Sequence, residues 1–234
     1  MLLLFDIDGT LLLKAYVAHR ESLHAALGTV YGLRELDDTK PRVPAAGRTD
    51  MEIAREMLLQ HGVSADRIDE RAERFRDACA REYARRCPAD LTDHVAPGVL
   101  DLLEALEGRD DVKLSLLTGN FEPIARLKLV RAGLGRHFPH GQGAFGSDHE
   151  DRAVLPTIAR RRAGTREEPW PRHDTIVIGD TPNDIACARA DQLRCLCVTT
   201  GPFDADELSG ADVVVPNARA LLPEIEKLLP RGQR

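Results

Sequence analysis

Two aspartates near the start of the chain are the first residues whose type and spacing could do chemistry. Asp6 and Asp8 lie in the stretch MLLLFDIDGTLLL, directly after the apolar run 2–5. If that run is a buried β-strand, alternate side chains share a face and both carboxylates point the same way. Carboxylates this close disfavour each other's ionisation, and a bound divalent cation would remove that cost. The pair could also be a plain strand-ending turn, since Asp and Gly are common in turns.

A second polar group follows the apolar stretch 112–117, where Thr118, Gly119 and Asn120 come in succession. A hydroxyl group, a flexible glycine and an amide at a strand end can hold phosphate oxygens through side chains and backbone N–H groups. The same tripeptide is equally compatible with an ordinary turn. The residue types alone leave both interpretations open.

A third polar group follows the apolar stretch 175–178, in the sequence GDTPND that contains Asp180 and Asp184. Asp184 falls in the first turn of a predicted helix, where a negative charge is favourable in any case. Asp180 has no such structural role. Ligands bind beyond the carboxyl ends of strands in open α/β sheets, so these carboxylates are expected to converge with Asp6 on one edge. Hard oxygen ligands of this kind suit Mg²⁺.

Strand-like and helix-like segments alternate over most of the chain, which predicts an α/β fold with a doubly wound parallel sheet. The nearly continuous apolar runs expected to form buried strands are 2–5, 112–117, 175–178, 194–199 and 212–215. The segments between them with helical spacing are 99–106, 122–132, 150–163 and 182–190.

Residues 15–94 interrupt this alternation and are predicted to form an inserted helical cap domain. They are rich in Arg, Glu and Ala and contain no strand-like run. Three segments within them have the spacing of amphipathic helices, namely 16–31, 50–61 and 66–86. The α/β core would then consist of residues 1–14 and 95–234.

Composition limits the possible partners and the compartment. The 234-residue chain has a formal net charge of −6, which argues against a nucleic-acid or anionic-membrane partner, because both need a basic face. The five cysteines are odd in number and form no CxxC motif, which indicates free thiols in a reducing cytoplasm. The apolar start of the chain is too short for a signal peptide, and no run approaches membrane-spanning length. The sequence gives no indication of the oligomeric state.

Taken together, these motifs make the sequence resemble the haloacid dehalogenase superfamily. The similarity is to phosphohydrolases whose helical cap, of the C1 type, follows the first strand, and within them to the phosphoglycolate-phosphatase-like branch. The matching motifs, in chain order, are Asp6-Ile7-Asp8-Gly9-Thr10, Thr118-Gly119-Asn120, and Gly179-Asp180 through Asp184. The order of the motifs and their positions after strands also match, over most of the chain. The resemblance implies a Rossmann-like core and a Mg²⁺-dependent phosphatase that acts on a small phosphorylated metabolite.

The resemblance also implies a role for each matched residue. Asp6 would be the nucleophile that forms an aspartyl-phosphate, and Asp8 would protonate the leaving alcohol and then activate water. Mg²⁺ would be held by Asp6, the backbone carbonyl of Asp8 and Asp180. Asp184 would support the site. The phosphoryl group would be held by the segment Thr118, Gly119 and Asn120.

The expected basic residue is where this sequence departs from the family pattern. The family has a lysine about 25 residues before the Asp180 motif, and Arg152 lies nearest to that position. Arginine can supply the same charge and can clamp phosphate, although it could instead pair with Asp148 or Glu150. Lys128 is the second candidate, but its neighbours favour an ordinary solvated position on a helix.

The cap is expected to supply substrate specificity. Its loop PAAGRTD places Arg48 before a predicted helix, where it could reach an anionic group of the substrate or simply be solvated. Thr49 and Glu52 fit a capping box at the start of that helix.

Other functions are compatible with the same fold. A phosphosugar mutase uses the same aspartyl chemistry, and a non-catalytic phosphometabolite-binding protein is possible because a fold does not guarantee activity. A dehalogenase is disfavoured, since those relatives need no metal and lack an acid at the position of Asp8.

Overall fold

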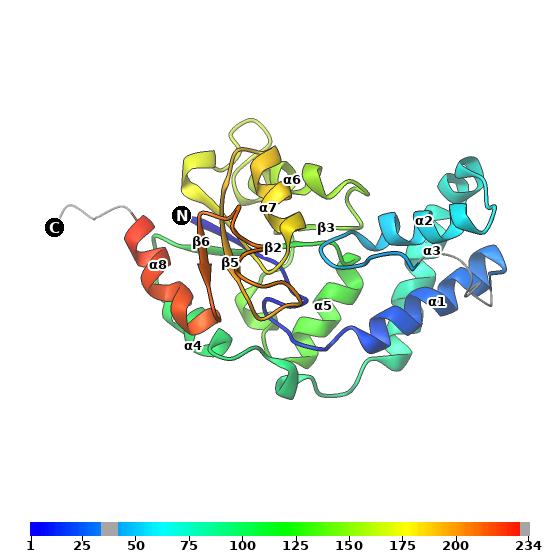
Figure 1. Ribbon diagram of the computed structural model, residues 1–234, viewed down its shortest axis with the longest axis horizontal. Helices are drawn as coiled ribbons and strands as arrows, with labels where there is room; N and C mark the ends of the chain where they lie inside the picture. The colour runs from blue at the N-terminus through cyan, green and yellow to red at the C-terminus, as the bar shows by residue number, and fades with distance from the viewer. Residues whose placement is uncertain (34–41, 230–234) are drawn as a thin grey trace.

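The computed structural model describes residues 1–33 and 42–229 and shows a six-stranded parallel sheet (Figure 1). The order of the strands across the sheet is β3-β2-β1-β4-β5-β6. The strands are β1 (Leu2–Phe5), β2 (Lys113–Thr118), β3 (Ala144–Phe145), β4 (Thr175–Gly179), β5 (Arg194–Val198) and β6 (Val213–Val215). This arrangement confirms the predicted α/β fold.

Helices cover both faces of the sheet because alternate residues of each buried strand point to opposite faces. The core helices are α4 (Val99–Glu107), α5 (Glu122–Arg131), α6 (Leu155–Ala163), α7 (Pro182–Ala190) and α8 (Leu221–Leu228). Leu3 and Phe5 of β1 belong to an apolar cluster with residues of α4, α5 and α8. Leu2 and Leu4 pack on the other face, with residues of α6 and α7. Each fully buried side chain of this size contributes about 1.5–3 kcal/mol to folding.

The predicted strands and helices are found close to their predicted bounds, with three differences. The segment expected to be one helix, 150–163, begins as a 3₁₀ turn over Arg152–Val154, and α6 follows it. Pro156 lies in the first turn of α6, where its missing N–H costs nothing. The sequence interpretation also missed β3, which has two residues, and α8.

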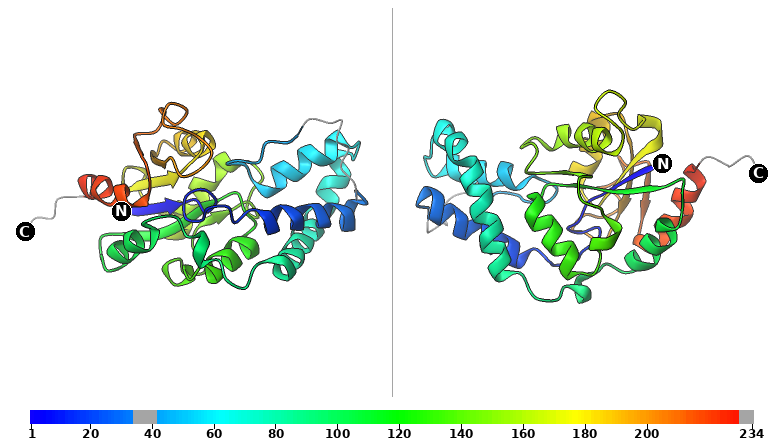
Figure 2. Two further views of the ribbon diagram at one scale, coloured as in Figure 1. Left: turned by 60° about the horizontal axis from the view of Figure 1, so that its bottom comes forward. Right: turned by 180° about the vertical axis from the view of Figure 1, so that it is seen from behind.

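The three helices α1 (Val17–Tyr31), α2 (Asp50–Gln60) and α3 (Ala65–Arg86) lie beside the sheet rather than on either face (Figures 1 and 2). They share an apolar cluster of their own, which includes Leu27, Leu58 and Phe75. Phe121 and Ile124, from the start of α5, complete this cluster. The helices therefore have a separate core that rests on one helix of the α/β unit.

The two segments that connect these helices to the sheet run side by side. Leu12 and Val95 form an antiparallel β-bridge. The Leu13 N–H donates to the His94 carbonyl oxygen at 2.7 Å, and the Ala96 N–H donates to the Leu11 carbonyl oxygen at 3.0 Å. The predicted boundaries between core and cap fall at this paired crossing, and the division into two domains remains our proposal.

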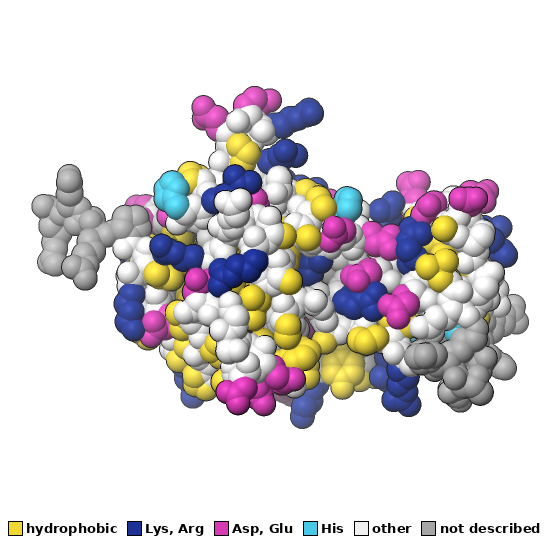
Figure 3. Space-filling view, turned by 45° about the horizontal axis from the view of Figure 1, so that its top comes forward, with side chains coloured by type: hydrophobic (Ala, Val, Ile, Leu, Met, Phe, Trp, Pro, Cys, Tyr) yellow, Lys and Arg dark blue, Asp and Glu magenta, His cyan; other side chains and the backbone are white. Residues whose placement is uncertain are grey.

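The surface carries charges of both signs. On the face in Figure 3, basic and acidic side chains are interspersed rather than gathered into one large patch of either sign. Within residues 1–33 and 42–229, the helices lack the combination of length and apolarity that a membrane span requires.

Candidate active site

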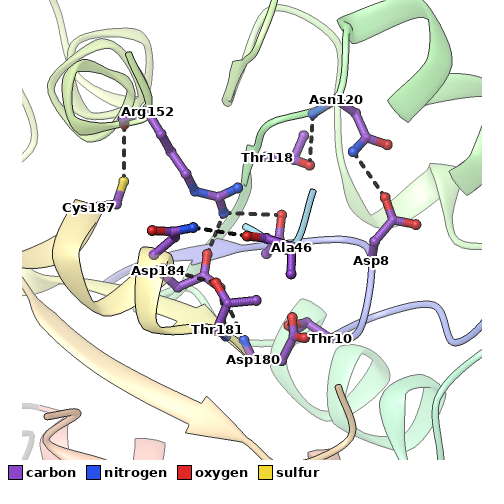
Figure 4. A network of polar contacts seen from close by, with 12 residues as sticks. Asp8, Thr10, Ala46, Thr118, Asn120, Arg152, Asp180, Thr181, Asp184 and Cys187 are labelled. Atoms are coloured by element: carbon purple, nitrogen blue, oxygen red, sulfur yellow. Dashed lines mark hydrogen bonds and ion pairs between the residues drawn. The ribbon is translucent and has the colours of Figure 1, made fainter. Parts of the chain in front are cut away.

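The sheet order brings the three sequence motifs to one edge. Strand β1 lies between β2 and β4, and all three run parallel. The residues that follow their carboxyl ends are therefore neighbours in space, although they lie far apart in the chain. Asp8, Asn120 and Asp180 accordingly come together in Figure 4.

Asp180 lies in a narrow space that two glycines make possible. Gly9 has a φ of +90°, and a Cβ atom there would lie 2.0 Å from Oδ2 of Asp180. A Cβ atom on Gly201 would lie 1.8 Å from the same oxygen. The Thr10 hydroxyl donates a hydrogen bond of 2.9 Å to Oδ1 of Asp180. The turn after β1 therefore fixes the Asp180 carboxylate, and sequence reasoning had assigned Thr10 no part in this.

Three carboxylates form a buried cluster at this edge. One oxygen each from Asp6, Asp180 and Asp184 lies within 4.8 Å of the others. Burial raises the pKa of Asp6 to about 7 and that of Asp180 to about 9, and neighbouring carboxylates add to both shifts. Side chains this crowded and this poorly solvated fit a hard divalent cation, whose charge would stabilise their ionised forms.

Asp184 has a different set of partners from the other two carboxylates. Its Oδ2 accepts hydrogen bonds from the N–H of Asp180 at 3.2 Å, the N–H of Thr181 at 3.0 Å and the hydroxyl of Thr181 at 2.7 Å. Thr181 and Asp184 form a capping box at the start of α7. Asp184 therefore orders the loop that carries Asp180, and its Oδ1 is left to face Arg152.

Arg152 is the cation of this cluster. Its Nη2 lies 3.3 Å from Oδ1 of Asp6. The same nitrogen contacts Asp184 (Figure 4). Burial alone would lower the pKa of Arg152, but Asp184 and Asp6 outweigh it and raise that pKa. The alternative partners proposed from the sequence are engaged elsewhere, because Asp148 pairs with Arg162 and Glu150 pairs with Arg55.

Asp8 lies in a second electrostatic environment, beside Lys128. The Lys128 Nζ lies 2.6 Å and 2.8 Å from the two oxygens of Asp8, and the Asn120 amide donates to Asp8 at 3.0 Å. Burial by itself would raise the pKa of Asp8, but Lys128 outweighs it and the pKa is lowered. The two aspartates of the first motif thus differ in their partners and in the direction of their pKa shifts.

The prediction that Lys128 is a solvated helix residue was wrong. Its side chain is fully buried, and it lies one helical turn after Ile124, which is also fully buried. The helix α5 therefore turns this side toward the cap and the Asp8 carboxylate. The apolar neighbours of Lys128, Leu127 and Leu129, had instead suggested that its side chain points to solvent.

The loop before α2 rests on the segment that carries Gly119 and Asn120. A Cβ atom on Gly119 would lie 2.0 Å from the Arg48 carbonyl oxygen. The Asp50 N–H donates to the Gly119 carbonyl oxygen at 2.9 Å, and the Thr49 hydroxyl donates to the Glu150 carbonyl oxygen at 2.6 Å. Glycine at position 119 is thus required for this close approach of cap and core.

The Arg48 side chain is paired within the cap. Its guanidinium donates to Glu52 at 2.8 Å and to Glu56 at 2.7 Å. A contact between Arg48 and a substrate remains a prediction, and it would have to replace or share these pairs. Thr49 accepts the N–H of Glu52 as a helix cap, as the predicted capping box requires on that side.

Comparison with known proteins decides the family. The family model of haloacid dehalogenase-like hydrolases matches residues 3–189 of the chain. The chain belongs to this family. The resemblance inferred from the motifs is confirmed, and the protein is a hydrolase.

Two curated relatives align with this haloacid dehalogenase-like hydrolase over almost its whole length. Phosphoglycolate phosphatase 1 of Pseudomonas aeruginosa is 27% identical in an alignment 229 residues long, which covers 95% of this chain and 78% of that protein. The phosphoglycolate phosphatase of Agrobacterium fabrum is 27% identical in an alignment 236 residues long, which covers 99% of this chain and 95% of that protein.

Solved structures share the fold at lower sequence identity. A β-phosphoglucomutase from Clostridium difficile has a TM-score of 0.68 at 16% identity, covering 97% of this chain and 95% of that one. A hydrolase from Pseudomonas syringae has a TM-score of 0.66 at 21% identity, covering 97% of this chain and 99% of that one.

Two further residues reach the site from the cap and were not expected there. His19 of α1 contacts Lys128, and Asp50 at the start of α2 contacts His19. Both are buried. A single histidine on a helix and an aspartate after a capping threonine carry no sequence signal of a site, so only the tertiary structure identifies them.

Proposed function

We propose that this hydrolase is a Mg²⁺-dependent phosphatase that cleaves a small phosphate monoester through an aspartyl-phosphate on Asp6. The observation that carries the proposal is the difference between the surroundings of Asp6 and those of Asp8. Asp6 lies with Asp180, Asp184 and Arg152, whereas Asp8 lies with Asn120 and Lys128. Two carboxylates in contrasting environments are suited to two different roles in one reaction.

In the first step, a carboxylate oxygen of Asp6 attacks phosphorus and the bond from phosphorus to the alcohol oxygen breaks. The departing oxygen takes a proton from Asp8. Asp8 must be protonated for this step, and the negative charge of an arriving phosphate group favours that form. Arg152 balances charge on the side of Asp6 throughout.

In the second step, a water oxygen attacks the phosphorus of phosphorylated Asp6. The bond from phosphorus to the Asp6 oxygen breaks, and the carboxylate leaves with the bonding electron pair. Asp8, now ionised, takes the proton from that water. The segment Thr118, Gly119 and Asn120 lies beside Asp8, where its backbone N–H groups are suited to hold the phosphoryl oxygens.

A divalent cation fits this site on the basis of its donors. Asp6, Asp180 and the Asp8 backbone carbonyl would hold Mg²⁺, and Asp184 would support them. The cation would offset the repulsion between an anionic nucleophile and an anionic phosphate.

Turnover of a panel of phosphate monoesters, with free phosphate as the readout, tests the proposed function. The panel should include 2-phosphoglycolate, because curated relatives carry that activity in their names. We expect phosphate release from at least one small monoester in the presence of Mg²⁺. Conversion of a hexose phosphate into its isomer without phosphate release would instead identify a mutase. Tight binding without turnover would identify a sensor.

Substitution of Arg152 should separate a charge-balancing role from a structural one. A hydrogen bond between charged groups contributes about 1.5–3 kcal/mol. We therefore expect Arg152→Ala to lower kcat/KM roughly tenfold to a hundredfold, and Arg152→Lys to recover part of that loss. Arg162→Ala is the matched control, because Arg162 pairs with Asp148 rather than with the cluster. Wild-type turnover by Arg152→Ala would show that this guanidinium does not serve the reaction.

Five free cysteines support a further proposal, that the protein works in a reducing compartment such as the cytoplasm. Four of the five are buried, which is the usual position of inert structural thiols.

A further inference from the structure

Lys128 is a fully buried cation that the proposed reaction does not use. Its Nζ contacts both oxygens of Asp8, the Asn120 Oδ1 at 2.8 Å and the His19 Nδ1 at 3.2 Å. An ammonium group has three protons, and these acceptors account for all of them. Lys128 thus has no proton left for a substrate, so its contacts point to a role in placing other side chains.

The side chain that Lys128 places is Asp8. The two Asp8 oxygens lie 2.8 Å and 2.6 Å from one Nζ, and the Asn120 amide donates to the second oxygen at 3.0 Å. Asn120 is itself held by Lys128 through its other amide atom. The carboxylate is therefore fixed from two directions by groups that also fix each other. A carboxylate held in this way spends little time in orientations from which it cannot react.

Lys128 is in turn held by the cap. Because an ammonium group can only donate, the His19 Nδ1 must accept, which places the ring hydrogen on Nε2. The His19 Nε2 lies 3.0 Å from Oδ2 of Asp50 and donates to it. The same Asp50 oxygen accepts the N–H of Phe121 at 2.7 Å, from the core. His19 is packed against Tyr83 of α3, with ring centroids 5.8 Å apart.

A buried ion pair is weak support for stability, because removing two charges from water costs several kcal/mol per ion. A lysine at this position is thus not explained by folding alone. Its four contacts join α5 to the loop after β1, to the segment after β2 and to α1. The contact with His19 of α1 is the one of the four that crosses from the core to the cap.

We propose that Lys128 is a positioning residue that orients the Asp8 carboxylate toward the water that hydrolyses phosphorylated Asp6, and that His19 and Asp50 of the cap hold Lys128 in place. The inference rests on the proposed phosphatase function. In the step concerned, a water oxygen bonds to phosphorus, the bond from phosphorus to the Asp6 oxygen breaks, and Asp8 takes the water proton. A misplaced Asp8 would slow this step more than formation of the aspartyl-phosphate, so the phosphorylated enzyme should accumulate.

Acid-quenched steady-state turnover of p-nitrophenyl phosphate tests the proposal, since p-nitrophenolate leaves without help from an acid. We expect Lys128→Met to lower kcat about tenfold to a hundredfold, with a larger fraction of phosphorylated enzyme than in the wild type. Lys113→Met is the matched control. Lys113 donates to the Ala163 carbonyl oxygen and lies near Trp170, and its substitution should leave kcat and the phosphorylated fraction unchanged.

Two substitutions of His19 test the role of the cap while Lys128 stays in place, and they decide the question even if Lys128→Met does not fold. His19→Asn keeps an acceptor near the position of Nδ1, and we expect it to remain within about threefold of the wild type. His19→Leu removes the acceptor, and we expect it to accumulate phosphorylated enzyme.

The outcomes separate this inference from the function on which it rests. A fall in kcat for Lys128→Met without accumulation of phosphorylated enzyme, or no fall at all, would overturn the positioning role. Equal behaviour of His19→Asn and His19→Leu would overturn the role of the cap. A wild-type chain that turns over no phosphate monoester would remove the phosphatase proposal itself, and this inference with it.

Discussion

Replacing Asp6 by asparagine is expected to reduce phosphate release at least about a thousandfold while leaving the protein folded. A neutral amide oxygen is a poor nucleophile toward phosphorus, so the aspartyl-phosphate cannot form. The substitution also removes one of three crowded buried carboxylates, so the free energy of unfolding should stay the same or increase. Phosphate release and urea unfolding, measured on the same preparation, check both parts.

Asp110→Asn is the control for this experiment, because Asp110 is exposed on the surface. It makes the same chemical change and should alter neither turnover nor stability. Wild-type turnover by Asp6→Asn would show that another residue is the nucleophile. A loss of turnover accompanied by unfolding would show instead that Asp6 is needed for the fold.

Removal of divalent cations should have a comparably large effect. We expect excess EDTA to abolish turnover and added Mg²⁺ to restore it, because the buried carboxylates have too little positive charge nearby to accept an anionic phosphate unaided. Asp180→Asn should raise the Mg²⁺ concentration for half-maximal activity at least about tenfold, since it removes one anionic oxygen ligand. A readout independent of activity is the melting temperature, which Mg²⁺ should raise in the wild type more than in Asp180→Asn.

Full activity in excess EDTA would contradict the metal site and would favour a metal-independent reaction of the dehalogenase kind. An equal response of the wild type and Asp180→Asn to Mg²⁺ would show that Asp180 is not a ligand. Asp110→Asn again provides the control, with an unchanged requirement for Mg²⁺.

The parts of the fold that could be predicted are those that depend on local sequence. Continuous apolar runs mark buried parallel strands, and polar residues at their ends mark the edge where ligands bind. This is why the segments after β1, β2 and β4 could be placed together from the sequence. The two-residue strand β3 was missed because so short a run has no periodicity to detect.

The parts that could not be predicted depend on contacts between distant segments. The position of Lys128 beside Asp8 joins residues 120 positions apart, and that of Thr10 beside Asp180 joins residues 170 positions apart. Apolar neighbours made Lys128 look like a surface residue of an amphipathic helix. Helix α5 in fact packs against both the sheet cluster and the cap cluster, which sequence periodicity alone does not reveal. Conversely, the basic residue Arg152 was assigned by its interval from the Asp180 motif, and it does lie beside Asp6 and Asp184.

The covalent intermediate provides the most direct test of the account, because its central claim is that Asp6 becomes phosphorylated. The Asp8→Ala variant should be mixed with Mg²⁺ and excess p-nitrophenyl phosphate, whose leaving group needs no acid, and then quenched in acid. Reduction with borohydride then converts any aspartyl-phosphate into homoserine, and fragmentation of the N-terminal peptide locates the modified residue. We predict homoserine at position 6, at a higher level than in the wild type, because loss of Asp8 slows hydrolysis of the intermediate. Turnover by the wild type with no modification in either protein, or with modification at another residue, would contradict the account.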